Sequence, residues 1–300
     1  MSERTWVGWQ GIVAEVPADW SLSAVSGDEK SGYFRVDSAG SLVLEVKWSG
    51  IGKGKVADLH GRLRAYLDDL RRRARKRRAA FESKIKTKDA GVLTFSWRSD
   101  RKAHGRLWLC DTCSRVVIAQ LSGSLSEDVS GAASRILSTV EDHSQDGWRT
   151  WAVYDLIAEV PPGYSLEKHR LMSGYIQLVF RKKSNRLILE RWGLANVALK
   201  NTSLRDWFLD RAAHDLKPFT FEIADADFDG EKGLQVNGRR SGPIEYLKAA
   251  RELLALRKPA MWLDGYVWIC EETNRVYSVQ SVHVRDETIL DETLERIECH

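Results

Sequence analysis

Residues 108–116 read WLCDTCSRV and residues 268–276 read WICEETNRV, so both follow the pattern Trp-x-Cys-acid-x-x-x-Arg-Val. Alternating apolar residues precede each cysteine, and a mostly apolar run follows each arginine. This alternation is typical of β-strands, and a polar segment between two strands is typical of a turn. Each stretch is therefore predicted to be a β-hairpin.

Further matches surround the two hairpins in the same order along the chain. The matching pairs are residues 12–22 with 156–166, 42–45 with 187–190, and 137–143 with 294–300. The period is about half the chain, which is far longer than the repeat units of solenoids and propellers. We infer a tandem duplication with a first domain at 1–146 and a second domain at 147–300.

Each copy is expected to run strands, a long helix, three strands and a closing helix. Apolar residues recur at helical spacing from Val56 to Ala74, and again in a shorter stretch before Pro218. The second copy also has a segment without a counterpart, predicted to be an inserted helix at about 243–259. The predicted fold class is α+β, with two tandem homologous domains, each a mostly antiparallel sheet covered by two helices.

The order of elements and a few short motifs support a family resemblance. The opening strand ends in Pro-x-x-aromatic at Pro17–Trp20 and at Pro161–Tyr164, and a last strand after a polar turn leads to the terminal helix. On these residues, each copy resembles the PsbP-like family, which includes a photosystem oxygen-evolving-complex subunit and a Ran-GTPase-binding protein. The resemblance implies an α/β sandwich that serves as an interaction module, with no active site to carry over.

Composition bounds the class of protein. Of 300 residues, 43% are hydrophobic and 29% are charged, which is typical of a folded globular chain. No apolar run is long enough to span a membrane, and residues 1–10 lack the regions of a signal peptide, so we expect a cytoplasmic protein. Four cysteines do not form a disulfide framework, and the scarcity of Asn and Gln favours a thermophile.

The positive charge is concentrated in the first copy. Lys and Arg outnumber Asp and Glu by 24 to 19 over residues 1–148, whereas the numbers are 22 and 23 over residues 149–300. The excess comes mainly from a basic run that we predict to be a partner-binding surface, made of Arg71, Arg72, Arg73, Arg75, Lys76, Arg77 and Arg78. Such a run suits an acidic protein or a nucleic acid. The alternative is a solvated helix end, where cations favour the helix dipole.

The cysteines in the first hairpin raise the question of a metal. Cys110 and Cys113 form a Cys-x-x-Cys at a turn, but a tetrahedral site needs two more ligands. His104, or Cys299 with His300, could complete such a site only if the fold brought them together. We expect no metal and no cofactor.

Other chemical candidates have structural explanations. Cys110 and Cys270 are predicted to be small core residues. Arg115 is expected to close its hairpin by bonding Asp111, and His143 is expected to face solvent. The glycine-rich residues 50–54 lack the Gly-Lys-Ser/Thr ending of a phosphate loop and are predicted to be an ordinary connection.

No catalytic constellation is visible in the sequence, so no catalytic residue is assigned. The sequence favours a non-enzymatic binding or adaptor protein whose basic helix, in the first domain, contacts an acidic partner. The alternative is a nucleic-acid-associated factor that binds RNA or DNA. An enzyme with a site between the domains ranks third, because no residues point to such a site.

Overall fold

The computed structural model describes residues 3–52, 56–89, 91–144, 146–228, 230–240, 261–284 and 289–299. The chain divides into two compact units, Met1–Ile157 and Ala158–His300. The inserted helix predicted at about 243–259 lies outside the described residues.

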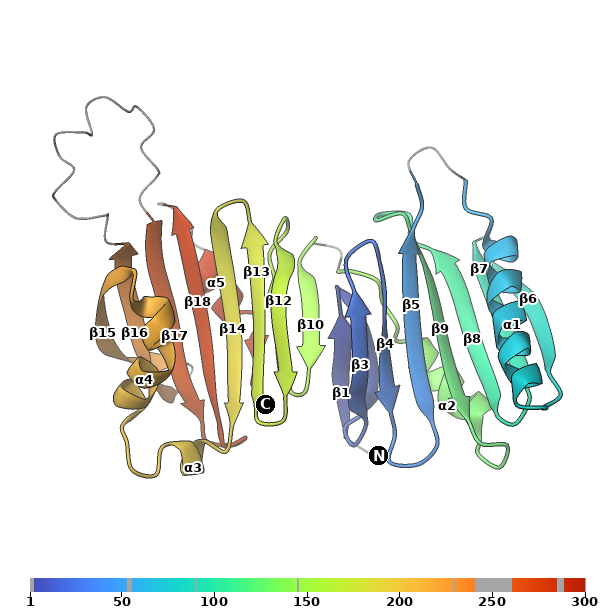
Figure 1. Cartoon of the computed structure of the whole chain (residues 1–300), viewed down its shortest axis with the longest axis horizontal. Coiled ribbons are helices and arrows are strands. Elements are labelled where there is room, and N and C mark those ends of the chain that lie inside the picture. Colours follow the sequence, from blue (N-terminus) through green and yellow to red (C-terminus); the bar gives the residue numbers. More distant parts are fainter. Residues whose placement is uncertain are drawn as a thin grey trace. The chain divides into compact units, whose positions relative to one another are not determined.

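A seven-stranded antiparallel sheet forms the centre of unit 1, in the order β3-β4-β5-β9-β8-β7-β6 (Figure 1). Its strands are β3 (Ser21–Gly27), β4 (Ser31–Asp37), β5 (Val43–Gly50), β6 (Glu82–Asp89), β7 (Val92–Arg98), β8 (Lys102–Leu109) and β9 (Arg115–Gly123). The predicted hairpin is β8, a turn and β9, with Leu109 paired to Val116. Two backbone hydrogen bonds of Cys110 close the turn: its carbonyl accepts from the Ser114 N–H, and its N–H donates to the Arg115 carbonyl.

Three further strands of unit 1 form a smaller antiparallel group. They are β1 (Arg4–Trp9), β2 (Ile12–Pro17) and β10 (Arg149–Val153), with β1 paired to both others. Trp9 and Trp151 are both buried and meet edge to face, with ring centroids 5.0 Å apart. Because β10 pairs with β1, it belongs with unit 1 although it follows residue 146.

The two helices of unit 1 lie over opposite faces of the seven-stranded sheet (Figure 1). Helix α1 (Leu59–Lys76) is in front of the sheet and α2 (Val129–Leu137) is behind it. Each helix begins with an aspartate whose carboxylate accepts a backbone N–H three residues later, Asp58 from Gly61 and Asp128 from Gly131. The apolar stripe of α1 packs on the sheet through Leu63 and Leu67, as its spacing predicts.

Unit 2 contains a second seven-stranded antiparallel sheet, in the order β12-β13-β14-β18-β17-β16-β15. Its strands are β12 (Ser165–Met172), β13 (Tyr175–Lys182), β14 (Asn185–Gly193), β15 (Phe219–Phe228), β16 (Glu231–Arg240), β17 (Met261–Cys270) and β18 (Arg275–Val284). The remaining elements are α3 (Ala195–Ala198), α4 (Leu204–Leu216), α5 (Ile289–Leu294), β11 (Leu156–Val160) and β19 (Ile297–Glu298). The sheet order corresponds strand by strand to that of unit 1.

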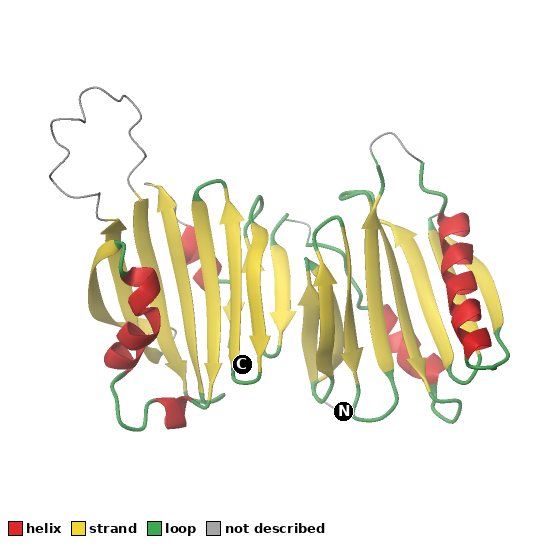
Figure 2. Cartoon of the chain, in the orientation of Figure 1, coloured by secondary structure: helices red, strands yellow, loops and turns green. Residues whose placement is uncertain are grey.

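The predicted α+β class with two helices over each sheet is wrong. Among the described residues 54% are in strands and 19% in helices, in three antiparallel sheets, so the protein is mostly β (Figure 2). The expectation of a PsbP-like α/β sandwich is wrong for the same reason. The error arose where strands have polar sequences: β3 and β6 have exposed residues along their lengths, because they are the edge strands of the sheet. Strand β6 has a single apolar residue, Ile85, which is too few for an alternating pattern to be recognised in the sequence.

Candidate functional site

The predicted contact run lies at the C-terminal end of α1 and only partly belongs to the helix. The helix ends at Lys76, Arg77 caps it, and Arg78 has a positive φ of 58°. Four cations of the run pair with acids of the same unit: Arg71 with Asp68 at 2.6 Å, Arg72 and Arg73 with Asp69 at 3.1 and 2.7 Å, and Arg77 with Asp100 at 3.1 Å. These ion pairs occupy part of the run, and its role as a partner-binding surface stays a prediction.

These ion pairs lie on the surface. Arg77 lowers the pKa of Asp100, chiefly through the hydrogen bond between them. Exposed pairs of this kind contribute little to stability. Among the described residues, the cations of the run without an ion pair are Arg75, Lys76 and Arg78, and all three are exposed.

A second cationic surface of unit 1 is a groove of about 400 Å³ between α2 and strands β6, β7 and β8. Three cations line this groove, Lys84 and Lys86 from β6 and Arg106 from β8. Hydroxyl groups line it as well, from Thr94, Ser96, Ser130, Ser134 and Ser138. Within the described part of the chain, no carboxylate lines the groove. We call it the cationic groove.

Strand alternation explains why the cations gather there. Lys84 and Lys86 point to one face of β6, whereas Ile85 between them packs into the core under α1. The guanidinium of Arg106 donates to the Val140 carbonyl and lies over the Trp108 ring, 4.3 Å from its centroid. Burial lowers the pKa of Arg106, but an arginine remains charged at neutral pH. Its Nε atom has no hydrogen-bond partner among the described residues.

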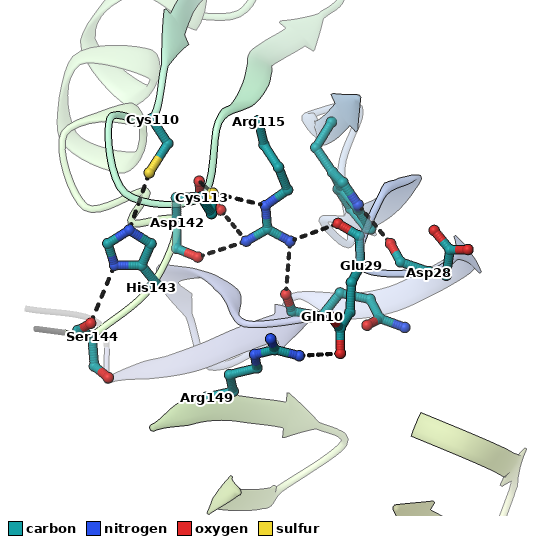
Figure 3. A network of polar contacts seen from close by, with 11 residues as sticks. Gln10, Asp28, Glu29, Cys110, Cys113, Arg115, Asp142, His143, Ser144 and Arg149 are labelled. Atoms are coloured by element: carbon teal, nitrogen blue, oxygen red, sulfur yellow. Dashed lines mark hydrogen bonds and ion pairs between the residues drawn. The ribbon is translucent and has the colours of Figure 1, made fainter. Parts of the chain in front are cut away.

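A third polar feature of unit 1 is a compact cluster at the β8–β9 turn (Figure 3). Cys110 Sγ lies 3.0 Å from His143 Nε2, and Cys113 Sγ donates to an Asp142 carboxylate oxygen at 2.9 Å. The two cysteines come from the turn, and Asp142 and His143 come from the segment after α2. Cys110 is buried and Cys113 is exposed. The residue as a whole is exposed, but its thiol is partly desolvated, and this desolvation together with the neighbouring Asp142 raises the pKa of Cys113 to about 12.

Arg115 connects this cluster to the rest of unit 1 (Figure 3). Its guanidinium forms a buried ion pair with Asp142, donates to the Asp142 and Gln10 carbonyls at 3.0 and 3.1 Å, and contacts Cys113 Sγ from Nε at 3.3 Å. The expected bond from Arg115 to Asp111 is replaced by this pair. His143, which was expected to face solvent, is half-buried and contacts Cys110, whereas Cys110 and Cys270 are buried, as predicted.

The residues that sequence reasoning missed are Asp142 and Arg106. Asp142 lies next to His143 in a segment that matches the end of the second copy, which was a usable signal. Neither His104 nor Cys299 joins the cluster; His104 lines the cationic groove, and Cys299 lies in unit 2. His300 lies outside the described residues.

Unit 2 contains a buried acid of a different kind. Glu190, on β14, accepts hydrogen bonds from Tyr175 Oη at 2.6 Å, from Gln177 Nε2 at 2.9 Å and from Gln280 Nε2 at 3.3 Å. Burial raises the pKa of Glu190 despite these donors.

We expect Glu190→Gln to stabilise the protein at neutral pH. A raised pKa means that the folded protein holds the proton more tightly than the unfolded chain, so stability falls as pH rises above the unfolded-state pKa. Glutamine carries no charge to bury, so the gain is expected at neutral pH and should vanish in acid. Urea unfolding at several pH values measures this gain. The exposed Glu222→Gln is the control, and equal effects for both variants would contradict the expectation.

The fold and these surfaces define a class: a mostly β protein of two units, one of which has a cationic groove. The part of the chain that the structure describes contains no helix long and apolar enough to cross a membrane. No protein family and no curated protein matches the chain.

Several solved structures match at low similarity. The immunity protein TplEi of the type VI secretion system from Pseudomonas aeruginosa has a TM-score of 0.34 and 11% identity, over 98% of this chain and 96% of that chain. The structure of TplEi in complex with "L" peptide has a TM-score of 0.31 and 11% sequence identity, and the match covers 94% of this chain and 88% of that chain. A chain of the Tle4–Tli4 complex has a TM-score of 0.32 and 10% sequence identity, and the match covers 95% of this chain and 87% of that chain.

Proposed function

We propose that the protein is a non-enzymatic binding protein whose cationic groove in unit 1 receives an acidic polypeptide segment. The observation that carries this proposal is the lining of the groove, where Lys84, Lys86 and Arg106 gather and where no carboxylate is among the described lining residues. Cations gathered in a concave surface focus a positive potential and attract acidic partners.

Lysines on a sheet edge have another role, because they discourage edge-to-edge aggregation. That role accounts for Lys84 and Lys86 on the edge strand β6. It does not require Arg106, which lies on β8, two strands further into the sheet. The three cations together therefore favour a binding surface.

Two features favour a polypeptide over a nucleic acid. Strand β6 is an edge of its sheet, and an extended peptide can add to such an edge through backbone hydrogen bonds. Acidic side chains of that peptide would then alternate toward Lys84 and Lys86. In addition, no exposed aromatic ring lines the groove within the described residues, whereas single-stranded nucleic acids are bound largely by stacking on such rings.

The basic run at 71–78 has a supporting role in this proposal. Its cations Arg75, Lys76 and Arg78 add to the positive field of unit 1 and speed the approach of an acidic partner. The contact itself is assigned to the cationic groove.

The double charge reversal Lys84→Glu/Lys86→Glu is expected to weaken binding of a labelled oligoglutamate peptide by about tenfold, because two exposed attractions become repulsions. Fluorescence anisotropy with the full chain measures the affinity. In the unmodified protein, added salt should weaken binding through screening.

The matched control is Lys168→Glu/Lys232→Glu, which makes the same charge change on exposed strand positions of unit 2. Equal losses in both double variants would reject the groove as the contact. Binding of a uridine oligonucleotide, with no binding of the acidic peptide, would replace this proposal with the nucleic-acid alternative.

A further inference from the structure

We propose that Cys110, Cys113, Asp142 and His143 bind a divalent transition-metal ion of the zinc class. One ligand atom from each residue lies within 4.8 Å of all the others. Two thiolates, an imidazole and a carboxylate are all ligand types that zinc accepts, and four protein ligands match its tetrahedral geometry. This inference is independent of the function proposed above.

The distances within the cluster suit such an ion. Zinc bonds of roughly 2.0–2.3 Å place neighbouring ligand atoms about 3.5 Å apart around a tetrahedron. Cys110 Sγ and His143 Nε2 are 3.0 Å apart, and Cys113 Sγ and the Asp142 oxygen are 2.9 Å apart. Small side-chain movements are therefore enough to seat an ion among the four ligands.

The imidazole of His143 is oriented as a metal ligand (Figure 3). Its Nδ1 atom lies 3.1 Å from the Ser144 carbonyl oxygen, which can only accept a hydrogen bond. Nδ1 therefore carries the proton, and Nε2, which faces Cys110, presents its lone pair. A ligating histidine that donates its other nitrogen to a carbonyl is the usual arrangement at protein metal sites.

Arg115 positions two of the other ligands. It pairs with one oxygen of Asp142 while the second oxygen faces Cys113, and its Nε contacts the Cys113 sulfur at 3.3 Å. Charge is balanced as well. Two thiolates, one carboxylate and a divalent ion sum to one negative charge, which the buried Arg115 neutralises. On binding, the two thiol protons leave for solvent and no electron is transferred.

The role of the metal would be structural. Four protein ligands leave no open position for a substrate. The ion would join the β8–β9 turn to the segment after α2, two parts of unit 1 that lie far apart in sequence. Cys113, Asp142 and His143 also line an open cavity of about 1090 Å³, through which an ion can enter.

Unit 2 provides an internal comparison. Thr273 stands at the position of Cys113, and Cys299 stands at the position of Asp142. Unit 2 keeps two thiols, Cys270 and Cys299, but Thr273 removes one of the four ligands, so we expect one ion per chain, bound in unit 1.

Cobalt(II) is a suitable probe for the site, since it takes tetrahedral thiolate sites and absorbs visible light there. The reduced, chelator-treated full chain is titrated with Co²⁺ and then with Zn²⁺. We expect thiolate-to-cobalt charge-transfer bands that saturate at one equivalent and disappear when zinc is added. Absence of these bands in the folded, reduced protein would overturn the proposal.

The variants Cys113→Ser and His143→Ala identify the ligands, with Cys299→Ser as the matched control. Changing a residue that only orients a ligand lowers metal affinity about 10–100-fold, so loss of a ligand should cost at least as much. Cys113 is exposed, so its replacement should leave the fold intact, which circular dichroism checks. Full cobalt affinity in both variants, or an equal loss in Cys299→Ser, would contradict the assignment.

Discussion

Replacing Arg115 with leucine is expected to lower the free energy of unfolding by about 3–5 kcal/mol, measured in the presence of a chelator. The Arg115 and Asp142 side chains are 9% and 5% exposed. Removing the cation leaves the carboxylate buried without a partner, and a buried unpaired charge is strongly destabilising. The Gln10 and Asp142 carbonyls also lose a donor.

Two further variants make this expectation specific. Arg98 lies exposed on β7, so Arg98→Leu should change stability by less than about 0.5 kcal/mol. The double variant Arg115→Leu/Asp142→Asn should regain part of the loss, because it leaves no charge uncompensated. If Arg115→Leu cost no more than Arg98→Leu in urea unfolding, the buried pair would not have the role described for it.

Replacing Leu63 with alanine is expected to cost about 2–5 kcal/mol. Leu63 is fully buried and packs with Leu67, Leu93 and Leu107 between α1 and the sheet. Truncation removes three carbons and leaves a cavity, since the sheet and the helix backbone restrict collapse around it. Thermal or urea unfolding measures the loss.

The neighbouring position on the same helix is the control. Arg64 is exposed, so Arg64→Ala should change stability by less than about 0.5 kcal/mol. Similar losses at positions 63 and 64 would mean that helix propensity, and not burial against the sheet, holds α1 in place.

Local patterns in the sequence identified the elements whose burial alternates regularly. The hairpin of β8 and β9 follows from apolar alternation around the polar turn at Cys110, and α1 follows from apolar residues at helical spacing. The same reasoning failed for β3 and β6. As edge strands they are exposed, and their polar sequences resemble connections between elements.

The basic run shows the limit of reading charge from sequence. Seven cations in eight positions predicted an available binding surface, but Asp68, Asp69 and Asp100 pair with four of them. Asp68 and Asp69 lie one helical turn before the run, and that spacing was visible in the sequence. Asp100 reaches Arg77 only because the β7–β8 turn lies beside the end of α1.

By itself, the sequence determined the paired hairpins, the amphipathic α1 and the concentration of positive charge in the first half, because each is a property of neighbouring residues. Only the tertiary structure placed Asp142 and His143 against Cys110 and Cys113, and Arg106 beside Lys84 and Lys86. Those groups are up to 33 residues apart, and their meeting depends on which strands pair and where α2 lies. Strand order is set by packing of the whole unit, which no local period reports.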